Sequence, residues 1–448
     1  MNYLIKNVTI FSNEGQNSIL RNHCVIVENT RIKAVLPEAD LPEKYVDFTV
    51  IDGGGRLLMP GLVNTHNHFY STFSRGLALL GTPKNFHEVL QMLWWRLDCS
   101  LDLEACYYSA LLPAIVAVKN GVTAIIDHHA SPHAVDGSLD RIEEALAKIG
   151  LRGALCYETS DRDGKEIARQ GLRENERYIR KCRTAKSQNP DHLFDAMFGL
   201  HASFTLDDDT LQAAADMSRS LERGCHIHVA EDPVDAQLTR EKYNAGLVER
   251  LQKFNILGGK TLTAHGIHLS ESEKDMLAES GAMLAHTPQS NMNNAVGRTD
   301  IFGYLRRGVL AGLGTDGMSG DLKPDIRTAM WLHKHDLRDS NAAWNEIQQM
   351  ALKNNPAIFE RVSGQKVGRI EAGCLADLIL VDYYPPTPLT GDNFWGHFLF
   401  GIMDAAVHLT MVNGKIMMQN GEIPGIDEQK IAADARTVAE GVWRRFQK

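Results

Sequence analysis

The stretch LLMPGLVNTHNH, residues 57–68, joins an apolar run to two histidines spaced two apart, His66 and His68. Side chains two apart on a β-strand point to the same side, so both imidazoles can face one ion. Without further context, a His-x-His pair is more often a pair of polar residues at a strand end than a metal site. Its interpretation depends on what ends the other apolar runs of the chain.

Seven more short apolar runs follow, and longer amphipathic stretches separate them. Together with the first run they give eight predicted strands, at residues 57–66, 122–128, 151–158, 194–201, 225–231, 261–265, 282–286 and 309–316. The predicted helices include 101–119, with Ser100 as N-cap, 207–223 and 271–280. Eight strand–helix units predict an α/β fold, a (β/α)8 TIM barrel, in which function lies at the carboxyl ends of the strands.

Polar side chains gather at these predicted strand ends. They are His66, His68, His128, His129, Glu158, His201, His228, Glu231, His265, His286 and Asp316. Histidines that belonged only to the core would not concentrate at strand ends. The pattern therefore favours a functional site at the mouth of the barrel.

The two flanks of the chain have a different pattern. Residues 1–56 and about 366–425 form short alternating runs split by glycine, which predicts two halves of a small β-sandwich. Residues 426–448 have the spacing of an amphipathic helix. The expected domains are 1–56, one half of the sandwich; 57–365, the barrel; and 366–448, the other half with the terminal helix.

Three histidines and one carboxylate are candidate metal ligands: His66, His68, His228 and Asp316. Neutral imidazoles and a carboxylate with one open position suit zinc or iron, and one divalent ion, zinc, is expected. Two purely structural interpretations stay open. Asp316 could initiate a turn, and His226, which precedes His228 by two residues, could have a structural role.

The composition and net charge of the chain limit the classes of partner that it is expected to bind. Hydrophobic residues make up 44% and charged residues 23% of the chain, and its net charge is −9, which is ordinary for a globular protein but unsuited to nucleic acid or anionic membranes. We find no uninterrupted apolar window of membrane-spanning length, so no membrane partner is expected. Seven scattered cysteines without a Cys-x-x-Cys pair, and an N-terminus unlike an export signal, favour a cytoplasmic protein.

Longer motifs carry a resemblance to a known family. Residues 58–68, 228–231, 264–266 and 314–316 resemble the amidohydrolase superfamily, in its guanine deaminase and chlorohydrolase branch, and residues 66–76, 93–98, 126–132 and 290–294 resemble its SsnA aminohydrolase subgroup. The resemblance implies that Glu231 shuttles protons together with Asp316 and that His265 holds water or substrate. It also places His201 in the substrate pocket and is compatible with a homodimer.

Five further residues are candidate substrate contacts: His128, His129, Arg75, Trp94 and Asn291. Each could instead be structural, the tryptophan as core, His129 as a loop cap and Arg75 as half of a surface ion pair. Guanine deaminases typically carry glutamine where this chain has Ser71, which argues against a purine bound in the same pose.

The expected function is that of a metal-dependent aminohydrolase. In it, a metal-activated water would attack an amidine-like carbon–nitrogen bond in a small heterocycle, purine-, triazine- or imidazole-like. A cyclic amide hydrolase or a chlorohydrolase-type displacement at the same site is the nearest alternative. A non-catalytic barrel scaffold is the alternative from another class.

Overall fold

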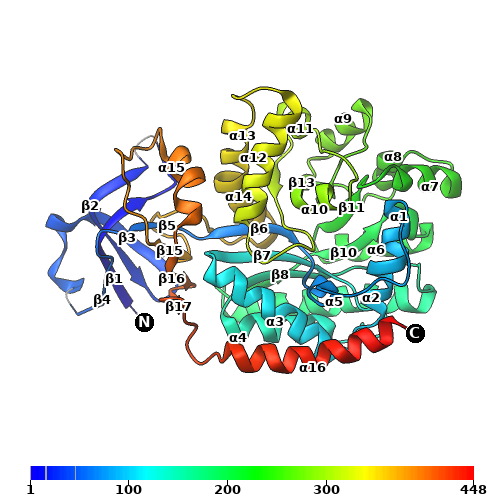
Figure 1. Cartoon of the computed structure of the whole chain (residues 1–448), viewed down its shortest axis with the longest axis horizontal. Coiled ribbons are helices and arrows are strands. Elements are labelled where there is room, and N and C mark those ends of the chain that lie inside the picture. The colour runs from blue at the N-terminus through cyan, green and yellow to red at the C-terminus, as the bar shows by residue number, and fades with distance from the viewer. Residues whose placement is uncertain (1, 16–17, 46) are drawn as a thin grey trace.

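The computed structural model describes residues 2–15, 18–45 and 47–448. Figure 1 shows a smaller sheet, built from both ends of the chain, beside a larger part in which helices surround parallel strands. The last helix, α16 (Glu428–Phe446), runs back along the larger part and packs against α3 (Leu103–Lys119).

Two parallel sheets form the centre of the larger part. The first has the order β6 (Leu62–Asn67), β7 (Val122–His129), β8 (Arg152–Tyr157), β9 (Phe194–Ala196). The second has the order β10 (Phe198–Ala202), β11 (Cys225–Val229), β12 (Leu262–His265), β13 (Met283–His286), β14 (Ala311–Leu313). Isolated parallel bridges join the two sheets, Asn67 with Asp316 and Thr159 with Leu200. The predicted parallel α/β architecture is confirmed, as two sheets that meet rather than one continuous closed ladder.

Two of the predicted strands are each divided in the structure. The run 57–66 becomes β5 (Leu57–Pro60), in the smaller sheet, and β6 in the larger part. Between them, the N–H of Gly61 donates to the carbonyl of Asp377, and a Cβ at Gly61 would lie 2.2 Å from the side chain of Thr123. The chain therefore crosses between the two parts at a position that only glycine fits. The run 194–201 is similarly split, into β9 and β10.

Helices follow the strands of the larger part and cover the parallel sheets (Figure 1). The predicted helix 101–119 starts two residues later than expected, because Asp102 rather than Ser100 is the N-cap and accepts a hydrogen bond from the N–H of Ala105. The other helices are α1 (Phe86–Val89), α2 (Trp95–Cys99), α4 (Ser138–Ile149), α5 (Lys165–Gln188), α6 (Asp208–Ser220), α7 (Pro233–Tyr243), α8 (Leu247–Lys253), α9 (Glu271–Ser280), α10 (Pro288–Asn293), α11 (Ile301–Arg306), α12 (Lys323–Leu337), α13 (Trp344–Gln349), α14 (Asn355–Ser363) and α15 (Phe394–Phe400).

The flanking segments, predicted as a β-sandwich, form one hydrogen-bonded sheet of eight strands. Its order is β17 (Lys415–Gln419), β16 (Val407–Val412), β15 (Leu378–Val381), β5, β1 (Asn2–Phe11), β2 (Ile19–Glu28), β3 (Arg31–Pro37), with β4 (Thr49–Asp52) paired to β1. Apolar side chains pack on both faces, because β1 and β2 each contribute residues to two separate clusters. Strands from both ends of the chain therefore belong to one structural unit.

A buried ion pair links this sheet to the larger part. Arg152, on β8, donates through Nε and Nη2 to the carboxylate of Asp377, at 2.8 and 3.0 Å, and neither side chain is exposed. Gln365 and Asn413 accept two further guanidinium hydrogen bonds, at 2.9 and 3.1 Å. The buried charge therefore has an opposite charge and additional polar partners, as a buried arginine requires.

Within the described part of the chain, no single helix has the length and apolar composition of a membrane span. The segments Phe86–Cys99 and Leu103–Lys119 reach that composition only when taken together, and a bend of 110° separates them.

Candidate active site

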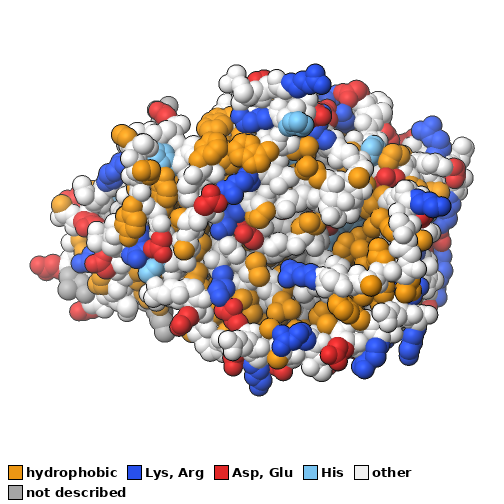
Figure 2. All heavy atoms as spheres, in the orientation of Figure 1, with side chains coloured by type: hydrophobic (Ala, Val, Ile, Leu, Met, Phe, Trp, Pro, Cys, Tyr) orange, Lys and Arg blue, Asp and Glu red, His pale blue; other side chains and the backbone are white. Residues whose placement is uncertain are grey.

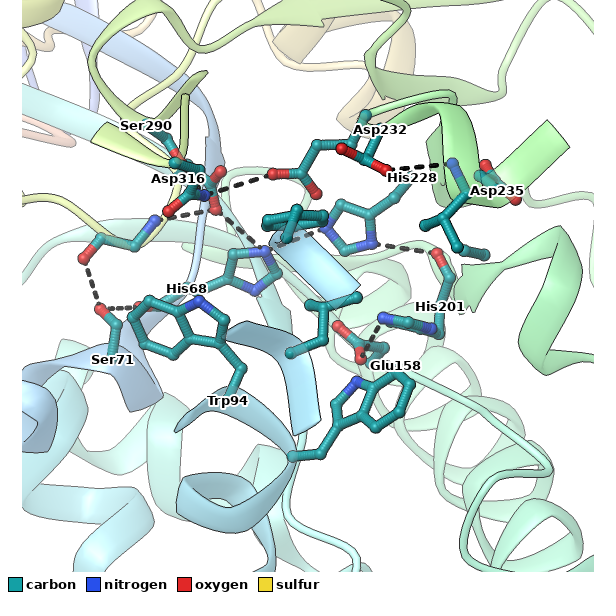
Figure 3. A pocket seen from close by; sticks show the side chains of 18 of the residues that line it. His68, Ser71, Trp94, Glu158, His201, His228, Asp232, Asp235, Ser290 and Asp316 are labelled. Atoms are coloured by element: carbon teal, nitrogen blue, oxygen red, sulfur yellow. Dashed lines mark hydrogen bonds and ion pairs between the residues drawn. The ribbon is translucent and has the colours of Figure 1, made fainter. Parts of the chain in front are cut away.

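Four potential metal-binding atoms converge where β6, β11 and β14 end, and Figure 3 shows His68, His228 and Asp316, which carry three of them. The Nε2 atom of His68 lies 3.0 Å from Nε2 of His228 and 3.2 Å from Oδ1 of Asp316. The Nε2 atom of His66 lies 3.8 Å from the same carboxylate oxygen and is buried without a hydrogen-bond partner. The structure therefore brings together the four residues that the sequence singled out as metal ligands.

Neighbouring strands settle which ring nitrogens carry hydrogen. The Nδ1 atom of His68 lies 2.5 Å from the carbonyl of His128, and Nδ1 of His228 lies 2.9 Å from the carbonyl of His201. A carbonyl oxygen can only accept, so both Nδ1 atoms donate, and in the neutral rings both Nε2 atoms present lone pairs. The third ligand is held in a similar way, since Nδ1 of His66 lies 2.9 Å from Nε2 of His226.

This donor set fits a divalent metal ion. Two imidazole lone pairs 3.0 Å apart, with a carboxylate oxygen beside them, repel one another unless a cation lies among them. Ligands that bind zinc tetrahedrally at about 2.0–2.1 Å lie about 3.3–3.4 Å from one another, which is close to the observed spacings. Burial, together with the neighbouring imidazoles, holds the pKa of His66 and of His228 well below the usual value, which favours the neutral form that binds metal.

Glu231 and His265 lie beside the ligand set. The Nε2 atom of His265 is 3.5 Å from Oε2 of Glu231 and 3.9 Å from Oδ2 of Asp316. Burial, and then the charge of Asp316, raises the pKa of Glu231 well above its usual value. Its carboxyl group therefore takes up a proton more readily than an exposed glutamate does, as suits a group that must bind and release one.

The backbone is strained at two of these positions. His265 has φ of 72° and Asp316 has φ of 53°, both in the left-handed region that side chains rarely adopt. The side chain of His265 is also fixed from behind, because its Nδ1 lies 3.0 Å from Oδ1 of Asn291 and 3.0 Å from Oγ1 of Thr287. Such strain concentrates at functional sites, where the surrounding structure holds a residue in place.

An open cavity lies over the four candidate ligands, and the empty space in it and above its mouth, open solvent included, is about 800 Å³. Figure 2 shows hydrophobic side chains gathered over α1, beside this mouth, and the apolar part of the lining includes Phe86, Leu90, Trp94, Trp95 and Phe204. Trp94 ends a π-helical turn, Leu90–Trp94, a rare geometry that is frequent at functional sites. The cavity can therefore hold a flat ring against aromatic side chains.

The six predicted substrate contacts occupy three kinds of place. His201 and Trp94 line the cavity. His128 and Asn291 lie one layer behind it, His128 with its Nδ1 3.2 Å from Oε2 of Glu158 and Asn291 against His265.

The remaining two predicted contacts do not reach this cavity. The Nε2 atom of His129 lies 3.0 Å from the hydroxyl of Ser131. Arg75 lines a separate groove beside Trp443 of α16.

Arg162 is one of several lining residues that the sequence did not single out. Arg162 follows β8, lines the cavity and forms ion pairs with Asp98 and Asp163. Asp98 lies 64 positions earlier in the chain, and no local pattern links the two residues. Glu158 and His201, both at predicted strand ends, were the signals in the sequence for this wall.

A parallel α/β fold with three histidines and an aspartate at strand ends defines a class of metal-dependent hydrolases. The family model described as "Amidohydrolase family" matches residues 57–417. The chain therefore belongs to the amidohydrolase family, and the resemblance found in the sequence is confirmed.

Curated relatives and solved structures match nearly the whole chain. A 5'-deoxyadenosine deaminase of Methanosarcina mazei is 29% identical to this chain. The alignment covers 99% of this chain and 98% of the relative. A 5-methylthioadenosine/S-adenosylhomocysteine deaminase of Pelotomaculum thermopropionicum is 29% identical, with 97% of each chain covered. The structure of an adenosine deaminase from Xanthomonas campestris with bound zinc superimposes with a TM-score of 0.80, at 22% identity and 98% coverage of each chain.

Proposed function

We propose that this protein is a metal-dependent deaminase that replaces an amino group on a ring carbon of an adenine-like heterocycle, in a nucleoside, by oxygen. The observation that supports it most directly is the convergence of four potential metal-ligating atoms, from His66, His68, His228 and Asp316. Membership of the amidohydrolase family and the names of the curated relatives support the same reaction.

Three finer features belong to this proposal. The two parallel sheets are the halves of a (β/α)8 barrel, supported by the bridges at both seams and by the similarity to the adenosine deaminase structure. The metal is zinc, for which three imidazoles and one carboxylate are an ordinary ligand set, with iron as the alternative ion. A cytoplasmic location is supported by the seven cysteines, all of them free thiols.

The four ligands would hold one divalent ion at the strand ends. When bound, the ion lowers the pKa of water and polarises the reacting carbon–nitrogen centre. Glu231, 3.5 Å from His265, receives the proton lost by the attacking water and returns it to the departing nitrogen. The balance is simple: one water is consumed, one C–N bond breaks, one C–O bond forms and ammonia leaves.

His265 holds the oxygen or the developing tetrahedral carbon in place. Because its Nδ1 donates to Asn291, its Nε2 accepts from a donor when the ring is neutral and donates when the ring is protonated. The hydroxyl hydrogen of Ser71 is not available to a substrate, because it is shared between the carbonyls of His68, at 2.8 Å, and Gly317, at 2.7 Å. This arrangement is consistent with an adenine-like base and leaves the guanine deaminase pose unsupported.

Ammonia release from metal-loaded protein tests the proposal. The substrates are 5'-deoxyadenosine, adenosine, guanine and an aminotriazine, each assayed with and without prior chelation. We expect ammonia from the adenine nucleosides, and its loss on chelation. A chloride or ring-opened product without ammonia would favour the rival hydrolases, and absence of both metal and turnover would favour a scaffold.

A further inference from the structure

The wall of the cavity opposite Asp316 carries charges that the proposed deamination does not use. Figure 3 shows Glu158 and His201 together on this side, with His68 and His228 between them and Asp316. The side chain of Glu158 is 2% exposed, and its two oxygens lie 3.2 Å from Nδ1 of His128 and 3.7 Å from Nε2 of His201. A buried carboxylate therefore forms part of the surface that a substrate meets.

Among the described residues, no side chain donates a hydrogen bond to the Glu158 carboxylate when the neighbouring imidazoles are neutral. Nε2 of His128 lies 3.1 Å from the carbonyl of His226 and donates to it, so Nδ1 of the neutral ring has no hydrogen to offer. His201 is arranged likewise, since its Nδ1 donates to the hydroxyl of Thr205, which itself donates to the carbonyl of Ala202. A hydroxyl or ammonium group of a substrate would supply the donor.

Arg162 does not neutralise this wall. Among the described residues that line the cavity, it is the only lysine or arginine, and Asp98 and Asp163 already engage it, the latter at 2.9 Å. Asp98, whose pKa burial raises to about 7, acts on this one guanidinium together with Asp163 and Glu158. The Nη1 atom of Arg162 has no hydrogen-bond partner among the described residues, so it can still donate to an acceptor on the substrate.

The rest of the lining adds no positive charge. Asp232 and Asp235 lie on another side of the cavity, where they accept hydrogen bonds from the N–H groups of Val234 and Ala230. The remaining wall is largely aromatic, and aromatic faces carry partial negative charge. An anionic substituent that reached beyond the metal compartment would meet carboxylates and ring faces.

We propose that the cavity selects its substrate by charge, accepting neutral or cationic heterocycles and rejecting those that carry an anionic substituent, with Glu158 as the specificity-determining residue. This inference rests on the proposed deaminase function and deepens it by naming the substrate class. Like charges brought together in a buried site discriminate strongly against the wrong ligand, by about 100-fold or more.

Three nucleosides with the same base test the inference. They are 5'-deoxyadenosine, which is neutral, 5'-amino-5'-deoxyadenosine, which is cationic, and adenosine-5'-carboxylic acid, which is anionic. We expect kcat/KM for the anionic compound to be at least about 100-fold below that for the neutral compound, mainly through KM, and the cationic compound to match or exceed the neutral one.

The Glu158→Gln variant removes the charge and keeps the shape. We expect it to raise the ratio of anionic to neutral kcat/KM by about tenfold. Glu241→Gln is the matched control, because Glu241 is exposed on α7, contacts Gln237 and changes the net charge equally; its ratio should equal that of the wild type. If the Glu158 variant does not fold, the ratio of anionic to neutral kcat/KM in the wild-type enzyme still tests whether the cavity selects by charge.

Binding separates this inference from the proposed function. Purine riboside and its 5'-carboxylic acid lack the amino group, so calorimetry on metal-loaded protein compares their Kd without turnover. Absence of ammonia from every nucleoside would refute the deaminase proposal. Equal affinity for the two ribosides, no binding of the neutral one, or an anionic nucleoside within threefold of the neutral one would overturn charge selection.

Discussion

Replacing Glu231 with glutamine should slow turnover severely and leave the metal in place. The carboxylate lies 3.5 Å from Nε2 of His265 and 3.4 Å from Nδ2 of Asn294, so its contacts are long and an amide of the same shape sacrifices little binding. What is lost is the ability to carry a proton, which contributes about 10²- to 10⁴-fold in rate. At about 1.4 kcal/mol per tenfold, the barrier rises by about 2.7 to 5.4 kcal/mol.

Steady-state ammonia release and elemental analysis measure the two parts of this prediction. We expect kcat to fall by at least 100-fold, KM to change by less than about threefold, and the metal content to equal that of the wild type, because Glu231 is not one of the four ligands. The control is Glu241→Gln, on the surface of the following helix α7. A metal-loaded Glu231→Gln enzyme with kcat within tenfold of the wild type would refute the proton-transfer role.

Three further outcomes follow from particular contacts. Asp316→Ala removes a ligand 3.2 Å from His68, so the purified variant should contain almost no metal; full occupancy would contradict the site. Asp377→Ala leaves the buried Arg152 without its ion-pair partner, so urea titrations should show a free energy of unfolding lower by about 3–5 kcal/mol. A loss below about 1 kcal/mol would mean that the ion pair is unimportant for stability. Burial raises the pKa of Asp325 to about 8, so the folded protein binds a proton there that the unfolded chain releases near pH 4; stability should fall between pH 5 and 8 by up to about 1.4 kcal/mol per unit relative to Asp325→Asn, and parallel pH profiles would exclude this.

The convergence of the four proposed metal ligands could be predicted because their signal is local. His66 and His68 follow an apolar run, and the two-residue period of a strand decides that they share a side. Parallel strands end on the same side of a sheet, so residues distant in sequence, such as His228 and Asp316, are expected together once the strands are counted. Nothing beyond periodicity and strand ends is needed for this part of the site.

The substrate wall could not be predicted in the same way. The pairing of Arg162 with Asp98 joins a loop to a helix 64 positions away, and no periodicity encodes such a contact. The division of the run 57–66 depends on Thr123, which approaches Gly61 from the neighbouring strand. Both features arise from tertiary packing, which overrides the local pattern wherever two distant segments meet.

The hydrogen bonds that orient His68 and His228 end on backbone carbonyls, those of His128 and His201. A carbonyl remains whatever side chain its residue bears. Residues 128 and 201 therefore serve the hydrolytic centre through their main chain, while their side chains support or line the wall that meets the substrate. Substitutions at residues 128 and 201 can therefore change the wall that meets the heterocycle. The main-chain carbonyls that orient His68 and His228 are retained in every such variant.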